Sequence, residues 1–302
     1  MLDVAIIGAG PAGLAAAIYA KRKGLEVEIF EASVAGGMLN EAVLIENYPG
    51  FEPMKGLELA NKMREHVERL QVRINEGFAI AEVKKANEHF VLKTSDGKEN
   101  EAKTIIIATG ARHRKLKVKG AEQFEGKGIS YCATCDGPLF ANKEVAVIGG
   151  GNSGAVNALY LSKICEKVYL IEYASELRCE KAYVSKLKEN NVDIITNAEI
   201  FEFFGNEMLK GLKYKDRKTG KEKTLSVAGA FIYIGIEPNS NLAKQLGCKL
   251  DEKGNIKVDM HMNTSVAGVF AAGDVTGVFQ QVIVACAQGA IAAESAYRYL
   301  NK

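Results

Sequence analysis

The chain has 302 residues, is 47% hydrophobic and 25% charged, and carries a formal net charge of +2. This composition is typical of a globular protein with one large or two medium domains, and it gives no reason to expect a nucleic acid or a membrane as partner. The chain has six cysteines, no basic leader before its first apolar run and no apolar run of membrane-spanning length, so we expect no secreted disulfide framework and a reducing, cytoplasmic location.

The first predicted elements form a dinucleotide-binding motif. A buried-type strand over residues 4–7 leads into a glycine-rich turn, and a helix over residues 14–23 and a strand over residues 27–30 follow. In this order of elements, the glycines bring backbone close to a pyrophosphate, and an acid that ends the second strand accepts a ribose hydroxyl. The predicted cofactor-binding residues of this motif are Gly8, Gly10, Pro11, Ala12, Gly13 and Glu31.

The chain then alternates turns with regular elements. We expect a glycine turn at Gly36-Gly37, where backbone can approach a ligand, and an amphipathic helix over residues 56–70. Short alternating runs predict a small antiparallel sheet over residues 72–100.

A buried strand over residues 104–107 precedes a plausible domain boundary. The basic run over residues 112–119 is either a docking patch for an acidic partner or a solvated connector between domains. We favour the connector.

Cys132 and Cys135 form a CxxC motif, and Asp136 follows it directly. Two thiols at this spacing can close and reopen a disulfide by exchange, in which the thiolate attacks. We expect a loop over residues 128–131 and then a helical turn, whose N–H groups favour the thiolate, while the carboxylate moves the proton. A zinc site would need two more ligands at matching spacing, and the other four cysteines are scattered singly, so we expect no metal.

A second dinucleotide motif follows the cysteine pair. Strands over residues 144–148 and 167–171 flank a glycine turn and a helix over residues 155–163. Two complete motifs imply two nucleotide-binding domains in one chain. The second strand ends at Glu172, which suits a free ribose 2′-hydroxyl and repels a 2′-phosphate, so the sequence favours NADH over NADPH. The predicted residues of this site are Gly149, Gly151, Asn152, Ser153, Gly154 and Glu172.

The last part of the chain closes both domains. A meander followed by a buried strand over residues 230–234 ends the second domain. A strand over residues 264–271 leads to Gly273-Asp274, where a carboxylate can hold a polyol hydroxyl. A long helix over residues 280–300 then directs its first N–H groups at a site suited to a flavin ring that gains negative charge.

With these motifs in place, the chain resembles the low-molecular-weight thioredoxin reductases over residues 4–300. The resemblance implies an α/β fold of two Rossmann-like, doubly wound domains, the second inserted into the first. Residues 1–112 and 241–302 would bind FAD, and residues 113–240 would form the pyridine-nucleotide domain with the redox cysteines. The segments that carry the resemblance are Gly8 to Gly13, Gly36-Gly37, Glu46-Asn47-Tyr48-Pro49-Gly50, Ala108-Thr109-Gly110, Cys132 to Gly137, Gly149 to Gly154, Gly273-Asp274-Val275 and Gln281.

The resemblance also implies roles for residues and partners. It implies a homodimer with one FAD per chain, and thioredoxin or a thioredoxin-like protein as substrate. Cys135 would accept electrons from the flavin, Cys132 would attack the substrate disulfide and Asp136 would handle the proton. Hinges near residues 111–120 and 236–242 would let one domain rotate between two arrangements. The further residues implied to bind FAD are Gly36, Gly37, Met38, Leu39, Asn47, Ala108, Thr109, Gly110, Gly273, Asp274, Gln280, Gln281 and Val282.

The chain departs from the family pattern at the donor site. NADPH-using members carry a His-Arg-Arg run after the second strand of this motif, with another Arg a few residues on, and here only Arg178 can match. Some relatives with a degraded dinucleotide site use a reduced deazaflavin or ferredoxin instead, but Gly149-Gly150-Gly151 argues against full loss of this site. The family's Arg-Gln before the last helix is changed to Gln280-Gln281.

Three functions are compatible with these residues. We favour an FAD-dependent disulfide reductase. The reverse reaction is a dithiol oxidase, in which substrate thiols reduce the flavin and dioxygen reoxidises it. The third is an FAD-bound redox sensor or scaffold that does not turn over.

Overall fold

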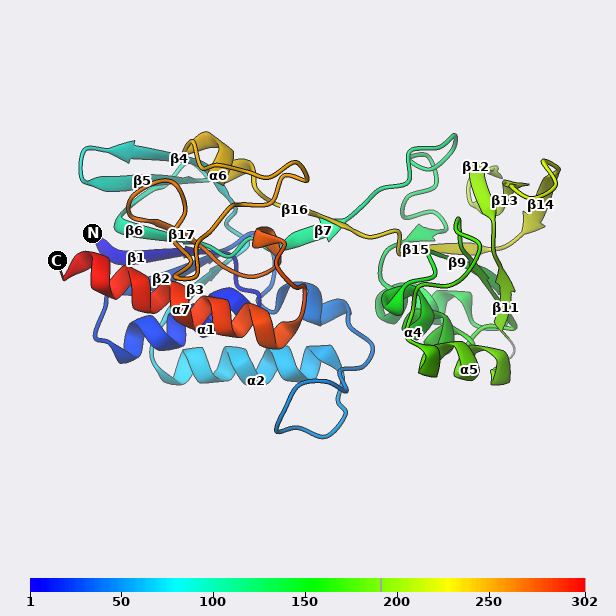
Figure 1. The fold of residues 1–302 in the computed structure, drawn as a ribbon, viewed down its shortest axis with the longest axis horizontal. Coiled ribbons are helices and arrows are strands. Elements are labelled where there is room, and N and C mark those ends of the chain that lie inside the picture. Colours follow the sequence, from blue (N-terminus) through cyan, green and yellow to red (C-terminus); the bar gives the residue numbers. More distant parts are fainter. Residues whose placement is uncertain (191, 302) are drawn as a thin grey trace. The chain divides into compact units, whose positions relative to one another are not determined.

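The computed structural model describes residues 1–190 and 192–301, which divide into two compact units (Figure 1). Unit 1 comprises Met1–Arg112 and Glu237–Lys302, and unit 2 is the intervening stretch His113–Ile236. The two segments at the unit boundaries, β7 (Ala111–His113) and β16 (Ile236–Pro238), pair as a two-stranded sheet. The chain therefore leaves unit 1 and returns to it at neighbouring strands.

Unit 1 is built on a seven-stranded sheet in the order β3-β2-β1-β6-β5-β4, with β17 beside β6. The strands β3, β2, β1, β6 and β17 run parallel, and β4 and β5 continue from β6 as an antiparallel extension. The strands are β1 (Leu2–Ile7), β2 (Val27–Glu31), β3 (Arg73–Glu76), β4 (Ile80–Ala86), β5 (His89–Thr94), β6 (Glu99–Ile107) and β17 (Val269–Ala271).

Helices α1 and α7 pack together on one face of this sheet (Figure 1). Their facing surfaces are rich in alanine, which allows close approach: a Cβ on Gly289 of α7 would collide with the carbonyl oxygen of Ala12 of α1. The other face of the sheet packs against residues around α6. The helices of unit 1 are α1 (Pro11–Arg22), α2 (Gly56–Arg69), α6 (Asn241–Gln245) and α7 (Val282–Leu300), with 3₁₀ turns η1 (Gly37–Glu41) and η3 (Asp274–Thr276).

Unit 2 repeats the parallel design on a smaller scale. Its main sheet has the parallel order β11-β10-β9-β15-β8, and β12, β13 and β14 form a separate antiparallel meander. Its elements are β8 (Ile129–Ser130), α3 (Ala133–Asp136), η2 (Gly137–Phe140), β9 (Glu144–Ile148), α4 (Asn152–Leu161), β10 (Lys167–Ile171), α5 (Lys181–Glu189), β11 (Val192–Ile195), β12 (Ala198–Gly205), β13 (Leu209–Asp216), β14 (Glu222–Ser226) and β15 (Gly229–Ile232). The predicted class, two Rossmann-like α/β domains with one inserted into the other, is confirmed.

Sequence-based expectations about local structure are met in part. The antiparallel pairing predicted over residues 72–100 is confirmed for β4, β5 and the start of β6, whereas β3 instead joins the main sheet in parallel beside β2. The predicted loop over residues 128–131 contains the strand β8, which pairs with β15. Only Val269–Ala271 of the predicted strand over residues 264–271 is a strand. In the part of the chain that the structure describes, no helix has the length and apolarity needed to cross a bilayer.

Candidate active site

Cys132 and Cys135 form a disulfide bond at the start of α3, with their Cα atoms 5.4 Å apart. Cys132 is the residue before the helix, and its Sγ accepts a hydrogen bond from the backbone N–H of Cys135 at 3.2 Å. The Oγ1 of Thr134 lies 3.3 Å from the same sulfur. Because hydrogen bonds to a sulfur favour its anionic form, this environment suits a Cys132 thiolate after reduction.

Asp136 lies within the same short helix, and Ser130 of β8 holds its carboxylate. The Ser130 hydroxyl donates to Oδ2 of Asp136 at 2.6 Å and accepts from the backbone N–H of Cys132 at 3.0 Å. One residue further on, the backbone N–H of Ala133 donates to the hydroxyl of Tyr233 at 3.0 Å. The cysteine pair and its acid are therefore fixed to two strands of the parallel sheet, β8 and the end of β15.

The first dinucleotide motif in unit 1 has the shape of a phosphate cradle. A Cβ on Gly8 would collide with the carbonyl oxygen of Ala108, and one on Gly13 with that of Gly8. At Gly10, directly before the first turn of α1, no described residue other than its two chain neighbours comes within 4 Å of the position of a Cβ. Two glycines thus permit tight packing while the middle one faces open space, as backbone approach to a pyrophosphate requires.

The turn after β2 is held by two strand-end carboxylates. Glu31 accepts from the N–H groups of Ala9 and Ser33 at 2.8 and 2.9 Å. Glu76, its register partner on β3, accepts from the N–H of Ala35 at 2.7 Å and forms a bidentate ion pair with Arg64. This places the Gly36-Gly37 turn beside the glycine cradle, since Gly36 N–H donates to the carbonyl of Ala9 at 2.8 Å.

Two acceptors near this cradle have no partner among the described residues. The Oδ1 of Asn40 is buried without a hydrogen bond. Asp274 follows β17, and no protein group in the described part of the chain hydrogen-bonds its carboxylate, whose pKa is raised by burial. Such orphaned acceptors suit the hydroxyl groups of a ribityl or ribose chain. The residues of unit 1 therefore fit a flavin dinucleotide.

The start of α7 joins two predicted cofactor residues that are distant in sequence. The Oε1 of Gln281 accepts from Nδ2 of Asn47 at 2.9 Å, and Val282 packs against the cluster around Leu39. The preceding Gly273 is fixed by the buried Gln288, whose Oε1 accepts the Gly273 N–H at 2.7 Å. The turn formed by Ala108, Thr109 and Gly110 is tied to Asn239 by three hydrogen bonds. Met38 lies in η1 between Gly37 and Leu39, and Gln280 is exposed just before α7.

The second dinucleotide motif in unit 2 reproduces the first. Gly149 packs against the carbonyl oxygen of Tyr233 and Gly154 against that of Gly149, while no described residue other than its two chain neighbours comes within 4 Å of a Cβ position on Gly151. Asn152 and Ser153 open α4, as Pro11 and Ala12 open α1. The cradle is therefore intact and suits a second dinucleotide.

Glu172 at the end of β10 plays the part that Glu31 plays in unit 1. It is 1% exposed, and it accepts from the N–H groups of Gly150 at 2.6 Å and Ala174 at 2.8 Å. Arg178 is largely exposed, and its Nη2 lies 3.4 Å from Oε1, the oxygen that also accepts from Ala174. The Glu172 carboxylate is thus buried beside the second glycine turn, and Arg178 is the one basic side chain that contacts it among the described residues.

The structure shows contacts to these segments from residues that the sequence did not single out. Side chains that hold the cysteine turn or the turns around the first glycine cradle are those of Ser130, Tyr233, Glu76, Arg64 and Gln288. The signal that could have found Glu76 is its place at the end of a strand next to Glu31. For the others no sequence signal exists, because their partners are fixed only by folding.

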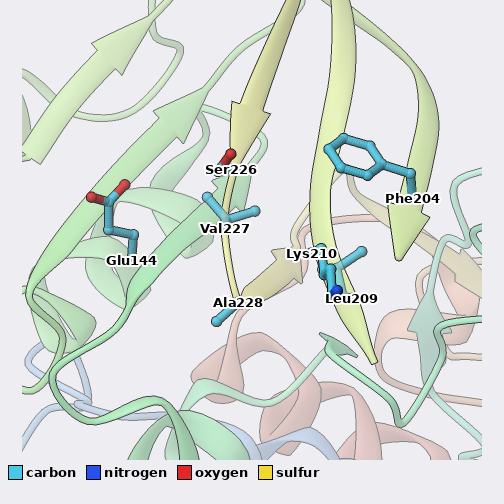
Figure 2. A pocket seen from close by; sticks show the side chains of 7 residues that line it. All are labelled: Glu144, Phe204, Leu209, Lys210, Ser226, Val227 and Ala228. Atoms are coloured by element: carbon cyan, nitrogen blue, oxygen red, sulfur yellow. The ribbon is translucent and has the colours of Figure 1, made fainter. Parts of the chain in front are cut away.

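The other four cysteines are not paired with one another, and one of them, Cys286, lies 3.8 Å from the carbonyl oxygen of Pro11 in the first cradle. Burial raises the pKa of Cys165 to about 11, and Cys179, Cys248 and Cys286 also have raised pKa values through burial. They are therefore poor nucleophiles. A hollow of about 600 Å³ lies in unit 2, between the start of β9 and the meander. Figure 2 shows the side chains that line it. Its lining residues are Glu144, Phe204, Leu209, Lys210, Ser226, Val227 and Ala228.

Comparison with known proteins agrees with this architecture. The chain is similar to the solved thioredoxin reductase of T. acidophilum, at 46% identity and a TM-score of 0.96, over 100% of this chain and 99% of that one. It is similar to the Lactococcus lactis thioredoxin reductase at 38% identity and a TM-score of 0.95, with the same coverage.

The chain is also similar to a subunit of a peroxide-reducing enzyme. The chain is 41% identical over 300 residues to a subunit of the alkyl hydroperoxide reductase of Staphylococcus aureus, matching 99% of this chain but 59% of that protein. The chain thus spans about 59% of the length of this curated relative. Residues 2–289 match the family model described as pyridine nucleotide-disulphide oxidoreductase. The resemblance predicted from the motifs is thereby confirmed, and this chain belongs to the pyridine nucleotide-disulphide oxidoreductases.

Proposed function

We propose that the protein is an FAD-dependent disulfide reductase that passes two electrons from a reduced donor to thioredoxin or a thioredoxin-like protein. The observation that carries the proposal is the Cys132–Cys135 disulfide with Asp136 in the same helical turn. The proposed FAD domain comprises residues 1–112 and 241–302, residues 113–240 form the proposed pyridine-nucleotide domain, and two copies form a homodimer. Bound FAD would supply the electron pair that opens the disulfide.

The chain's own residues account for the exchange step. In the reduced protein the Cys132 thiolate attacks one sulfur of the substrate disulfide, so that a mixed disulfide forms and the substrate S–S bond breaks. The departing substrate sulfur takes a proton from the carboxyl group of Asp136. Cys135 then attacks the Cys132 sulfur of the mixed disulfide, its thiol proton passes to the second substrate sulfur, which leaves as a thiol, and the Cys132–Cys135 disulfide is restored. Two electrons and two protons leave the protein in each cycle.

NADH is the donor that we favour. The intact cradle at Gly149, Gly151 and Gly154 supports a dinucleotide, and the buried charge of Glu172 opposes a 2′-phosphate. Arg178 alone offsets that charge. A deazaflavin or ferredoxin donor is the alternative if the second cradle only serves packing.

The substrate has a second candidate. Because the chain is 41% identical to a subunit of alkyl hydroperoxide reductase, a disulfide-bearing protein of a peroxide-reducing system is also a reasonable electron acceptor. The same cysteine pair would serve both substrates. Purified thioredoxin and a purified peroxide-reducing thiol protein, offered in parallel, distinguish them by the rate of donor oxidation.

The first experiment mixes the FAD-loaded protein anaerobically with NADH and separately with NADPH. We expect the flavin absorbance to bleach rapidly with NADH and slowly with NADPH. Preferential bleaching by NADPH would show that Arg178 and nearby basic side chains outweigh Glu172. If neither bleaches the flavin, reduced ferredoxin, a reduced deazaflavin and a small dithiol are tried next. Oxygen consumption with the dithiol alone would replace the reductase by the dithiol oxidase.

A further inference from the structure

We propose that Ser130 is a positioning residue for the disulfide exchange step, because its single hydroxyl holds both the acid and the backbone of the attacking cysteine. This inference rests on the role proposed above for Asp136. The Ser130 oxygen lies 2.6 Å from Oδ2 of Asp136 and 3.0 Å from the N–H of Cys132. The Asp136 carboxylate and the backbone of Cys132 are thus both hydrogen-bonded to the Ser130 hydroxyl oxygen.

The geometry assigns the hydroxyl proton to the carboxylate. A serine hydroxyl has one hydrogen to donate and can accept from other donors. The alternative acceptor, the carbonyl oxygen of Cys132, lies at 3.4 Å, which is far longer than the 2.6 Å to Asp136. The Cys132 N–H then donates to the same oxygen. Ser130 therefore uses its donor on the acid and its lone pair on the cysteine backbone.

The support for Ser130 is rigid. Ser130 is 7% exposed and belongs to β8, where it is the register partner of Phe231 in the neighbouring strand β15. Although β8 is a two-residue strand at the edge of the sheet, its pairing with β15 and the burial of Ser130 limit the movement of this oxygen. The helical turn that carries Asp136 is only four residues long and cannot fix the carboxylate by itself.

The hydrogen bond from Ser130 affects the proton transfer from Asp136 in the exchange step. When the departing sulfur takes the proton of Asp136, the carboxylate becomes negative, and a hydrogen bond donated by Ser130 stabilises that charge. Ser130 keeps its own proton throughout. It thus acts through Asp136 and not on the substrate, and its effect is confined to leaving sulfurs that need a proton.

The test uses the FAD-loaded protein, reduced with dithiothreitol and freed of it, and two small disulfides. Bis(2-hydroxyethyl) disulfide releases a basic thiolate, whereas 5,5′-dithiobis(2-nitrobenzoic acid) releases a weakly basic one that needs no acid. We expect Ser130→Ala to slow the first reaction about tenfold and leave the second nearly unchanged. Ser130→Thr, which keeps the hydroxyl, should restore the first rate. Ser162→Ala, which removes a hydroxyl that donates to the Leu159 carbonyl at 2.9 Å, is the matched control.

Asp136→Asn separates this inference from the proposed function. If Asp136→Asn slows both disulfides equally or neither, the acid role fails. If Asp136→Asn slows only the hydroxyethyl disulfide and Ser130→Ala does not, the Ser130 inference alone fails. Equal slowing of both disulfides by Ser130→Ala would mean that it merely displaces Cys132. The double variant should be no slower than Asp136→Asn, because Ser130 acts through that residue.

Discussion

We expect the buried carboxylate of Asp274 to lower the stability of the folded protein at neutral pH and to strengthen the binding of FAD. Burial raises its pKa in the folded protein, so the folded state disfavours the ionised form. Stability is therefore complete below the pKa of the unfolded chain, about 3.9, and falls as the pH rises through the higher folded value. In FAD-free protein, Asp274→Asn should be more stable than the wild type at pH 7 and equal to it near pH 3. Thermal unfolding at both pH values measures this.

The same substitution should act in the opposite direction on cofactor retention. We expect Asp274→Asn to release FAD more readily on gel filtration, because an amide is a weaker acceptor for a hydroxyl than a carboxylate. Glu252→Gln, in an exposed turn of the same unit, is the control for a charge change alone. A variant that is stabilised at pH 3 as well as at pH 7 would rule out ionisation as the cause.

The sequence predicted site residues correctly where the residues of one motif lie next to one another in the chain. Cys132, Cys135 and Asp136 adjoin one another, and the glycines of each cradle have a fixed spacing, so their types alone indicated the sites. Tyr233 could not be predicted, because it meets Ala133 across 100 positions of sequence. The ion pair of Arg64 with Glu76 depends in the same way on the packing of α2 beside β3.

The contact between α1 and α7 gives a test at the level of elements. Gly289→Ala adds a methyl group that collides with the carbonyl of Ala12 and lies 3.1 Å from the nitrogen of Ala16. The helices must separate, which should cost about 1–3 kcal/mol despite the better helix propensity of alanine. Urea denaturation measures this loss, and Ala287→Ser on the exposed side of α7 is the matched control. Stability equal to that of the wild type would show that the helices can move apart freely.

Elements were predictable from periodicity but not from apolar content alone. The strand over residues 167–171 was predicted with its observed ends. The run over residues 264–268 is rich in β-branched residues, yet Thr264 and Val266 both bond to Val269 and close a turn, with Gly268 at a φ of +80°. Short polar strands such as β3 were missed as members of the parallel sheet because they lack a buried run.

At the scale of the whole molecule, unit 2 should fold without unit 1. Each apolar cluster lies within one unit, and the ends of unit 2 meet at β7 and β16. We expect a fragment of residues 111–238 to unfold cooperatively in urea and to form the Cys132–Cys135 disulfide, as thiol titration can show. The two segments of unit 1, expressed without their insert, serve as the comparison. A fragment without a cooperative transition would show that its cores depend on unit 1.

The pairing of β7 with β16 also suggests how substrate specificity can change during the evolution of such proteins. In the proposed mechanism, every group that touches a protein substrate lies between these strands, and the first cradle lies outside them. An exchange of genetic material at the two boundaries would deliver a new acceptor specificity in one event while the flavin chemistry was inherited unchanged. Relatives named for thioredoxin and for hydroperoxide reduction share this whole chain. Their divergence can therefore be sought in the inserted segment first.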